Sequence, residues 1–143
     1  MKEKTLQDIH LGQRASFTKT ITEADVVLYA GLTGDFNRVH VDEEYARNTR
    51  FGGRIAHGLL VAGLVQPALS AITTPGGVSL HYEFDLKAPV HLGDTITAEA
   101  EVVEIHQDKP IVTLETRCTN QRGEVVISGR AVIYMVSEKD RKG

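Results

Sequence analysis

Several features of targeting, membrane and disulfide-bonded proteins are missing from this sequence. It has one cysteine, Cys118, so no disulfide can form within the chain. Its longest apolar run, Leu59 to Val65, is far shorter than the roughly 20 residues that a membrane-spanning helix needs. The opening MKEKTLQDIHLGQ lacks the apolar core of a signal peptide. We therefore expect a cytoplasmic protein without a membrane span.

Excess charge and the common cofactor motifs are also absent. The chain has 16 Lys and Arg against 19 Asp and Glu, a formal net charge of −3, and no long run of one sign. We therefore expect no nucleic acid partner. There is no GxSxG, P-loop or GxGxxG, so serine nucleophiles, ATP and dinucleotides lack support. The six histidines follow no ligand spacing such as HExxH, and no metal or other cofactor is predicted.

The composition is that of one ordinary globular domain. Of the 143 residues, 41% are hydrophobic and 24% are charged, which suffices for a single core. No repeat, linker or low-complexity tract divides the chain, so residues 1–143 are predicted to form one domain. Cys118 lies in a strand pattern and is expected in the core rather than as a nucleophile.

The first half of the chain has a helical period. The sequence TEAD predicts a helix start at Thr22, and we expect Gly31 and Gly34 to end that helix. A short helix over residues 43–47, capped by Asp42, is also predicted.

The third helical segment, HGLLVAGLVQPALSAI, is apolar on nearly every side. Such a helix must be covered by other structure, because otherwise too much apolar area stays in water. Pro67 lacks the N–H that an α-helix uses, and it should kink this helix rather than divide it.

From Val78 onward apolar and polar residues alternate, which predicts four strands, and residues 15–21 predict a fifth. The alternation slips at Val103, which indicates a β-bulge. Short turns favour antiparallel neighbours, and long twisted strands can curl around one helix. The predicted class is α+β, with a long antiparallel sheet wrapped around the central apolar helix. The edge of that sheet needs cover, so we expect a homodimer or a higher homo-oligomer.

The stretch LTGDFNRVHVDEEY contains the candidate chemistry. Asp35 and Asn37 are common turn residues, and a histidine such as His40 beside apolar neighbours is more often a half-buried ring than a catalyst. His57 and Gly58 equally suit a plain helix start. Each residue alone therefore favours a structural role.

The combination is more informative than its members. Asp35 and His40 are separated by a short loop, so both can converge on one water, with one group to deliver a proton and one to remove it. The first N–H groups of the helix beginning near Gly58 can stabilise a carbonyl oxygen that gains negative charge. Acid, base and oxyanion donor together indicate proton chemistry beside an activated carbonyl.

The stretches GDFNRVHVDEEYA and FGGRIAHGLLVAGLV resemble the signature of the MaoC-like (R)-specific enoyl-CoA hydratases, the hydratase-2 group of hot-dog-fold proteins. The likeness extends to FDLKAPVHLGDTI and so covers nearly the whole chain. It implies hydration of a trans-2-enoyl-CoA to an (R)-3-hydroxyacyl-CoA, with the CoA thioester as substrate and no cofactor.

The resemblance also implies roles for individual residues. Asp35 and His40 match the catalytic pair that holds the water, and Gly58 matches the residue whose N–H polarises the thioester carbonyl. Three further residues of the signature are expected to contact the substrate or shape its site: Asn37, Phe51 and His57.

Two departures from the family pattern bear on activity and on specificity. Many relatives have proline where this chain has Arg38, which affects the stiffness of the loop. Some relatives carry a serine on the central helix near the site, where the corresponding stretch of this chain has Gly63 and Gln66. Other functions stay open: a 3-hydroxyacyl dehydratase acting on acyl carrier protein, a thioesterase, a non-catalytic acyl-CoA-binding module, or a scaffold without a ligand.

Overall fold

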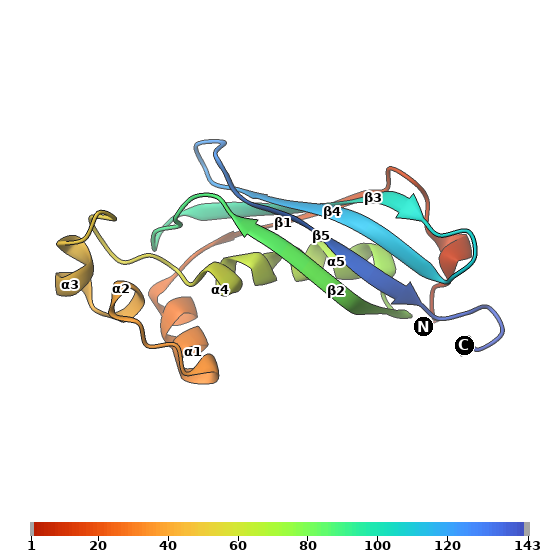
Figure 1. Ribbon diagram of the computed structural model, residues 1–143, viewed down its shortest axis with the longest axis horizontal. Helices are drawn as coiled ribbons and strands as arrows, with labels where there is room; N and C mark the ends of the chain where they lie inside the picture. The colour runs from red at the N-terminus through yellow and green to blue at the C-terminus, as the bar shows by residue number, and fades with distance from the viewer. Residues whose placement is uncertain (1, 142–143) are drawn as a thin grey trace.

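The computed structural model describes residues 2–141, which form one five-stranded antiparallel sheet with helices on one face (Figure 1). The strand order is β1-β3-β4-β5-β2, so β1 and β2 are the edges. The strands are β1 Arg14–Thr20, β2 Gly77–Leu86, β3 Thr95–Ile105, β4 Ile111–Thr119 and β5 Val125–Met135. The helices are α1 Glu23–Thr33, α2 Arg38–Val41, α3 Glu43–Arg47, α4 Gly58–Ala62 and α5 Gln66–Thr73, with 3-10 turns η1 Leu6–Asp8 and η2 Gly63–Val65. Residues 1 and 142–143 of the predicted domain lie outside the described residues.

The sheet confirms the predicted α+β class and all five predicted strands. Alternate residues of β3 face the helices and are buried, namely Ile96, Ala98, Ala100 and Val102. The register of β3 against β4 shifts between Val102 and Glu104, which confirms the bulge predicted at Val103.

The helix α1 begins as predicted but ends later than Gly31. Thr22 accepts from the Asp25 N–H, and the Asp25 carboxylate accepts from the Thr22 N–H, so a complete capping box starts the helix. Gly34 ends it in the left-handed conformation, with φ +82°. Gly31 lies inside the helix, so the prediction that it ends there is wrong. A glycine inside a helix costs only about 1 kcal/mol relative to alanine, which the remaining turns outweigh.

The two short helices that follow differ in how well they could be predicted. The helix α3 matches the predicted range, and Asp42 caps it by accepting from the Tyr45 N–H at 3.1 Å. The helix α2 was not predicted, because four residues give no measurable helical period.

The central apolar segment is one helical run from Gly58 to Thr73, as predicted, with its distortion just before Pro67. The run passes from α4 through η2 into α5, and the residues at both junctions keep right-handed helical dihedrals. The Gly63 carbonyl accepts from the Gln66 N–H, three residues on. That carbonyl is the acceptor that an N–H at position 67 would use, so the 3-10 turn replaces the bond that proline lacks.

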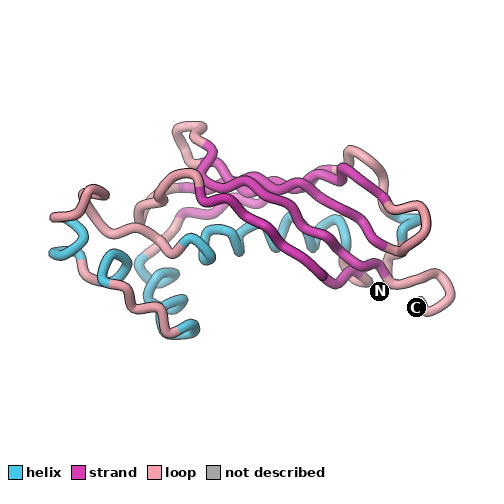
Figure 2. Tube along the Cα trace, in the orientation of Figure 1, coloured by secondary structure: helices cyan, strands magenta, loops and turns pink. Residues whose placement is uncertain are grey.

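The sheet covers only one side of this helical run. Val61, Val65 and Leu69 are buried against the strands, whereas Leu59 is 65% exposed and Gly63 and Gln66 lie on the surface. Figure 2 shows the strands in a single layer, with the helical run along one face. The five strands cover one side of the helix only. This chain alone therefore does not provide the full cover that the sequence predicts.

Apolar side chains also stand exposed on the edge strand β2. Val78, Leu80, Tyr82 and Leu86 are all at least a third accessible.

None of the helices described above combines the length and the apolarity needed to cross a membrane.

Candidate active site

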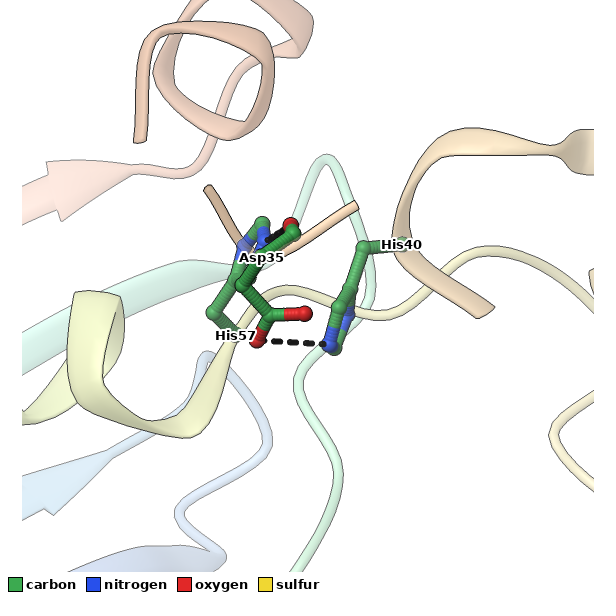
Figure 3. A group of neighbouring side chains, drawn as sticks. All are labelled: Asp35, His40 and His57. Atoms are coloured by element: carbon green, nitrogen blue, oxygen red, sulfur yellow. Dashed lines mark hydrogen bonds and ion pairs between the residues drawn. The ribbon is translucent and has the colours of Figure 1, made fainter. Parts of the chain in front are cut away.

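Polar side chains of the loop after α1 form its turns, and one carboxylate oxygen of Asp35 takes no part in these turn bonds. Asp35 Oδ1 accepts from the Asn37 N–H at 3.2 Å, and Asn37 Oδ1 accepts from the Val39 N–H at 3.1 Å, which caps α2. These are the turn roles that the residue types favour. The second oxygen of Asp35 points toward His40 (Figure 3). Turn chemistry therefore positions this side chain for a further role.

His40 lies on α2 with its ring nearly buried and its tautomer fixed. Its Nδ1 lies 2.7 Å from the Ile55 carbonyl oxygen. A carbonyl can only accept, so Nδ1 holds the proton and Nε2 of the neutral ring has a free lone pair. Nε2 lies 4.0 Å from Asp35 Oδ2, too far for a direct hydrogen bond but close enough for one water to contact both. The pair thus has the geometry of a base and an acid around one water.

His57 lies behind this pair and contacts both members. Its Nε2 donates to the backbone carbonyl of Asp35 at 3.0 Å, as Figure 3 shows. Its ring stacks on the His40 ring, with the centroids 3.9 Å apart and the planes at 26°. The Tyr29 ring also contacts the His57 ring, with the centroids 4.7 Å apart and the planes at 53°. The predicted neighbours Asp35, His40 and His57 are therefore brought together.

Gly58 begins α4 immediately after His57. The first N–H groups of a helix have no acceptor within the helix, so those of Gly58 and Leu59 are available to a ligand. A Cβ at position 58 would lie 2.5 Å from a methyl carbon of Leu86, so a side chain there would displace Leu86. Glycine keeps this helix end close to β2.

Phe51 has contacts with Arg50 and His91. The Arg50 guanidinium lies over its ring at 4.7 Å, and its carbonyl accepts from His91 Nε2 at 2.8 Å. The predicted contact of Phe51 with the substrate stays a prediction.

Arg54 supports the pair and was missed by the sequence reasoning. Its Nε donates to the His40 carbonyl at 2.6 Å, and its Nη1 pairs with Glu23 at 2.5 Å. It therefore ties α2 to the start of α1. These contacts span 14 and 31 residues, and no local pattern marks them.

Arg38 ties α2 to α3. Its guanidinium pairs with Asp42 at 3.1 Å and lies over the Tyr45 ring at 4.5 Å. The Asn37 backbone has φ −51° and ψ 129°, and this ψ lies in the range that a following proline would also impose. The loop therefore has the conformation that proline favours without having the proline.

A metal would also find ligand types here. Asp35, His40 and His57 each offer an atom within 4.8 Å of the others. Tetrahedral zinc ligands lie only about 3.4 Å apart, so the 4.0 Å between His40 Nε2 and Asp35 Oδ2 would have to contract. The distance fits a shared water better than a shared ion, and metal-free chemistry stays our prediction.

A recess of about 590 Å³ lies on the other face of the sheet. Its charged side chains pair across strands, as Arg14 does with Glu101 at 3.0 Å and Arg117 with Glu99 at 3.3 Å. No histidine lines this recess, whereas the other site sets the imidazole of His40 beside the carboxylate of Asp35, so the Asp35–His40 site is the better candidate.

Cys118 is a core residue rather than a nucleophile. It is fully buried on β4, and burial raises the pKa of its thiol to about 12. The thiol therefore stays protonated near neutral pH, as its place in the strand pattern predicts.

Comparisons with known proteins agree with this geometry. A family model described as "MaoC like domain" matches residues 6–122. The chain is 44% identical over 130 residues to an (R)-specific enoyl-CoA hydratase of Rhodospirillum rubrum, covering 90% of each protein. It is 38% identical to the (R)-specific enoyl-CoA hydratase of Aeromonas caviae, covering 90% of this chain and 97% of that one. The solved structure of R-hydratase PhaJ1 from Pseudomonas aeruginosa matches with a TM-score of 0.87 and 37% identity, over 96% of this chain and 88% of that chain. The resemblance and the hot-dog fold predicted from the sequence are confirmed.

Proposed function

Since the chain belongs to the MaoC-like domain family, we propose that it is an (R)-specific enoyl-CoA hydratase, a hydro-lyase that adds water reversibly to a trans-2-enoyl-CoA. The observation that supports this best is the free Nε2 of His40, which faces an Asp35 oxygen across a gap of 4.0 Å. A proton acceptor and a carboxyl group on either side of one water are what hydration needs.

The reaction follows from these positions. His40 Nε2 takes a proton from the water as its oxygen bonds to the β-carbon, and the electron pair of the double bond moves toward the thioester carbonyl. The Gly58 N–H stabilises the negative oxygen that forms. Asp35 returns a proton to the α-carbon, and the proton on His40 then restores the Asp35 carboxyl group. Both groups act from one side of the substrate, so addition is syn, and the (R) configuration of the product is proposed from the (R)-specific hydratases that this chain resembles.

The substrate brings its own activating group. The thioester carbonyl makes the β-carbon electrophilic, so no redox cofactor or metal enters the proposal. Asn37 contributes by capping α2 and so fixing the loop that holds Asp35. Phe51 keeps its proposed role as a substrate contact.

An assay with crotonyl-CoA tests this function. The purified protein should bleach the absorbance of the conjugated enoyl thioester, and chiral analysis should find only the (R)-3-hydroxy product. Release of free CoA thiol would instead identify a thioesterase. Saturable binding without turnover, across enoyl-CoAs of increasing length, would identify a binding module and contradict the proposal.

Acyl carrier protein is the alternative acyl donor. A parallel assay with an enoyl-carrier-protein thioester separates the two substrates. We expect the CoA thioester to react with the higher kcat/KM, because the sequence predicts no basic surface for an acidic carrier. A higher kcat/KM on the carrier thioester would support the dehydratase alternative.

We also propose that two copies pair through β2. An edge strand presents unpaired N–H and C=O groups, and this one adds exposed Val78, Leu80, Tyr82 and Leu86. An antiparallel pairing of β2 with its copy about a two-fold axis would continue the sheet. It would also help to cover the exposed side of the central helix at Leu59.

A cytoplasmic location belongs to the same proposal, in keeping with the single free cysteine.

A further inference from the structure

We propose that His57 is a positioning residue that holds the acid, the base and the oxyanion donor in one arrangement, and that it does not contact the substrate. The inference rests on the proposed hydratase function and replaces the substrate contact expected for this residue. Three separate contacts of His57 lead to it, one to each part of the reaction machinery.

The first contact fixes the loop of the acid. His57 Nε2 lies 3.0 Å from the Asp35 backbone oxygen, which can only accept, so Nε2 is the protonated nitrogen of the ring. Asp35 is half exposed, and its hydrogen bonds with Thr33 and Asn37 are local to the loop. The bond to His57 spans 22 residues and joins this loop to the start of the central helix.

The second contact supports the base. The His57 ring lies flat against the His40 ring, at 3.9 Å and 26°, on the side away from solvent. The bond from His40 Nδ1 to the Ile55 carbonyl fixes one point of the His40 ring, and the stack fixes its plane. Together they aim Nε2 at Asp35. Tyr29 also packs against the His57 ring and limits its movement.

The third contact is through the backbone. The His57 carbonyl accepts from the Leu60 N–H at 3.1 Å and the Val61 N–H at 3.2 Å, which starts α4 at this residue. Gly58, whose N–H is the proposed oxyanion donor, is the next residue in the chain. A shift of His57 would therefore move the oxyanion donor together with the pair.

The ring itself is unsuited to touch a substrate and is not placed for stability alone. His57 is only 2% exposed, and its Nδ1 is buried without a hydrogen-bond partner. A buried unpaired polar atom destabilises a protein, and a phenyl ring of similar shape would avoid that cost. A buried ring that leaves one polar atom unpaired, yet is bonded to the acid loop and stacked on the base, is best explained by positioning.

Two substitutions separate the hydrogen bond from the ring. His57→Phe keeps the stack and removes the Nε2 donor, whereas His57→Gln places an amide donor where Nε2 lies and removes the ring. His57→Asn is the matched control for Gln, because its amide is one methylene too short to reach the Asp35 carbonyl. Each variant is assayed on crotonyl-CoA for kcat and KM, and its Tm is measured.

We expect His57→Phe to lower kcat by about 10–100-fold, as misplacement of reacting groups does, with KM little changed and Tm equal to or above that of the wild type. His57→Asn, which loses both the donor and the stack, should lose kcat at least to that extent, and His57→Gln, which keeps a donor and loses only the stack, should lose clearly less than His57→Asn. A merely structural residue would show kcat falling only where Tm falls.

Three results would overturn the inference while the wild type remains active. These are an unchanged kcat in His57→Phe, a raised KM with kcat intact in any variant, and equal kcat in His57→Gln and His57→Asn. If His57→Phe fails to fold, the comparison of Gln with Asn still decides. An inactive wild type would count against the hydratase function instead, so the two failures are distinguishable.

Discussion

Arg38 is the residue whose departure from the family pattern the structure explains best. It stands at the first position of α2, where a backbone N–H has no partner within the helix, and the preceding Asn37 already has a ψ of 129°. Proline suits both conditions. Arg38 instead joins α2 to α3 through Asp42 and Tyr45, a connection that proline could not make.

Arg38→Pro should therefore be tolerated. The stiffer unfolded chain raises the free energy of unfolding by less than about 1 kcal/mol, and loss of an exposed ion pair offsets part of that gain. Urea unfolding measures the difference, and kcat on crotonyl-CoA should stay within about twofold. Val39→Pro is the matched control, because the Val39 N–H donates to Asn37 Oδ1 and its loss should destabilise α2. A large loss of activity in Arg38→Pro alone would contradict this account of the loop.

Single residues also show how far the sequence predicts a site. Asp35 and His40 lie within one short loop, so their proximity follows from spacing, and the turn roles of Asp35 and Asn37 follow from residue type. The Ile55 carbonyl that sets the His40 tautomer and the Arg54 side chain that supports α2 are brought in by tertiary packing. No local pattern encodes contacts of this kind.

At the scale of elements, the helices and strands with a clear apolar periodicity in their sequence were the ones that could be predicted. Strands of seven to eleven residues show a clear alternation, and even the β3 bulge appears as a slip in phase. The four-residue α2 has no period, and the end of α1 depends on a dihedral angle rather than on composition. Two glycines lay near that end, and only the structure distinguishes them.

Those two glycines should respond oppositely to alanine. Gly31 lies inside α1 with open space at its Cβ position, so Gly31→Ala should raise the free energy of unfolding by about 0.5–1 kcal/mol. Gly34 has φ +82°, which alanine adopts only with strain, so Gly34→Ala should lower it by about 1 kcal/mol or more. Urea denaturation of both variants measures the two effects. Equal shifts would place the end of α1 elsewhere.

At the scale of the whole molecule, one chain leaves its apolar surface unevenly covered. The sheet buries one side of the central helix, while Leu59 and the apolar side chains of β2 remain in solvent. The sequence predicted that the helix needs cover but not which strand edge would supply it. We propose β2 as the surface for a second copy, because apolar exposure and an open edge coincide there.

Leu80→Glu tests this assembly. A charge on the β2 edge should shift the protein from dimer to monomer in light scattering after size exclusion, because a dimer would bury it without a partner. Leu11→Glu is the matched control, since Leu11 is exposed to a similar extent outside the sheet and should leave the dimer intact. A wild-type monomer, or a Leu80→Glu dimer, would contradict pairing through β2.

The initial rate of crotonyl-CoA hydration by two near-isosteric variants tests the central claim most directly. In Asp35→Asn the side-chain carbonyl oxygen can still accept from the Asn37 N–H, and in His40→Asn the amide can still donate to the Ile55 carbonyl, so both local structures are kept. Asp35→Asn loses only the group that faces the shared water, and His40→Asn loses that group together with the ring that stacks on His57. With Tm near that of the wild type, we expect each rate to fall by about 10²–10⁴-fold. A rate within fivefold of the wild type in either variant would contradict a mechanism in which Asp35 and His40 act on one water.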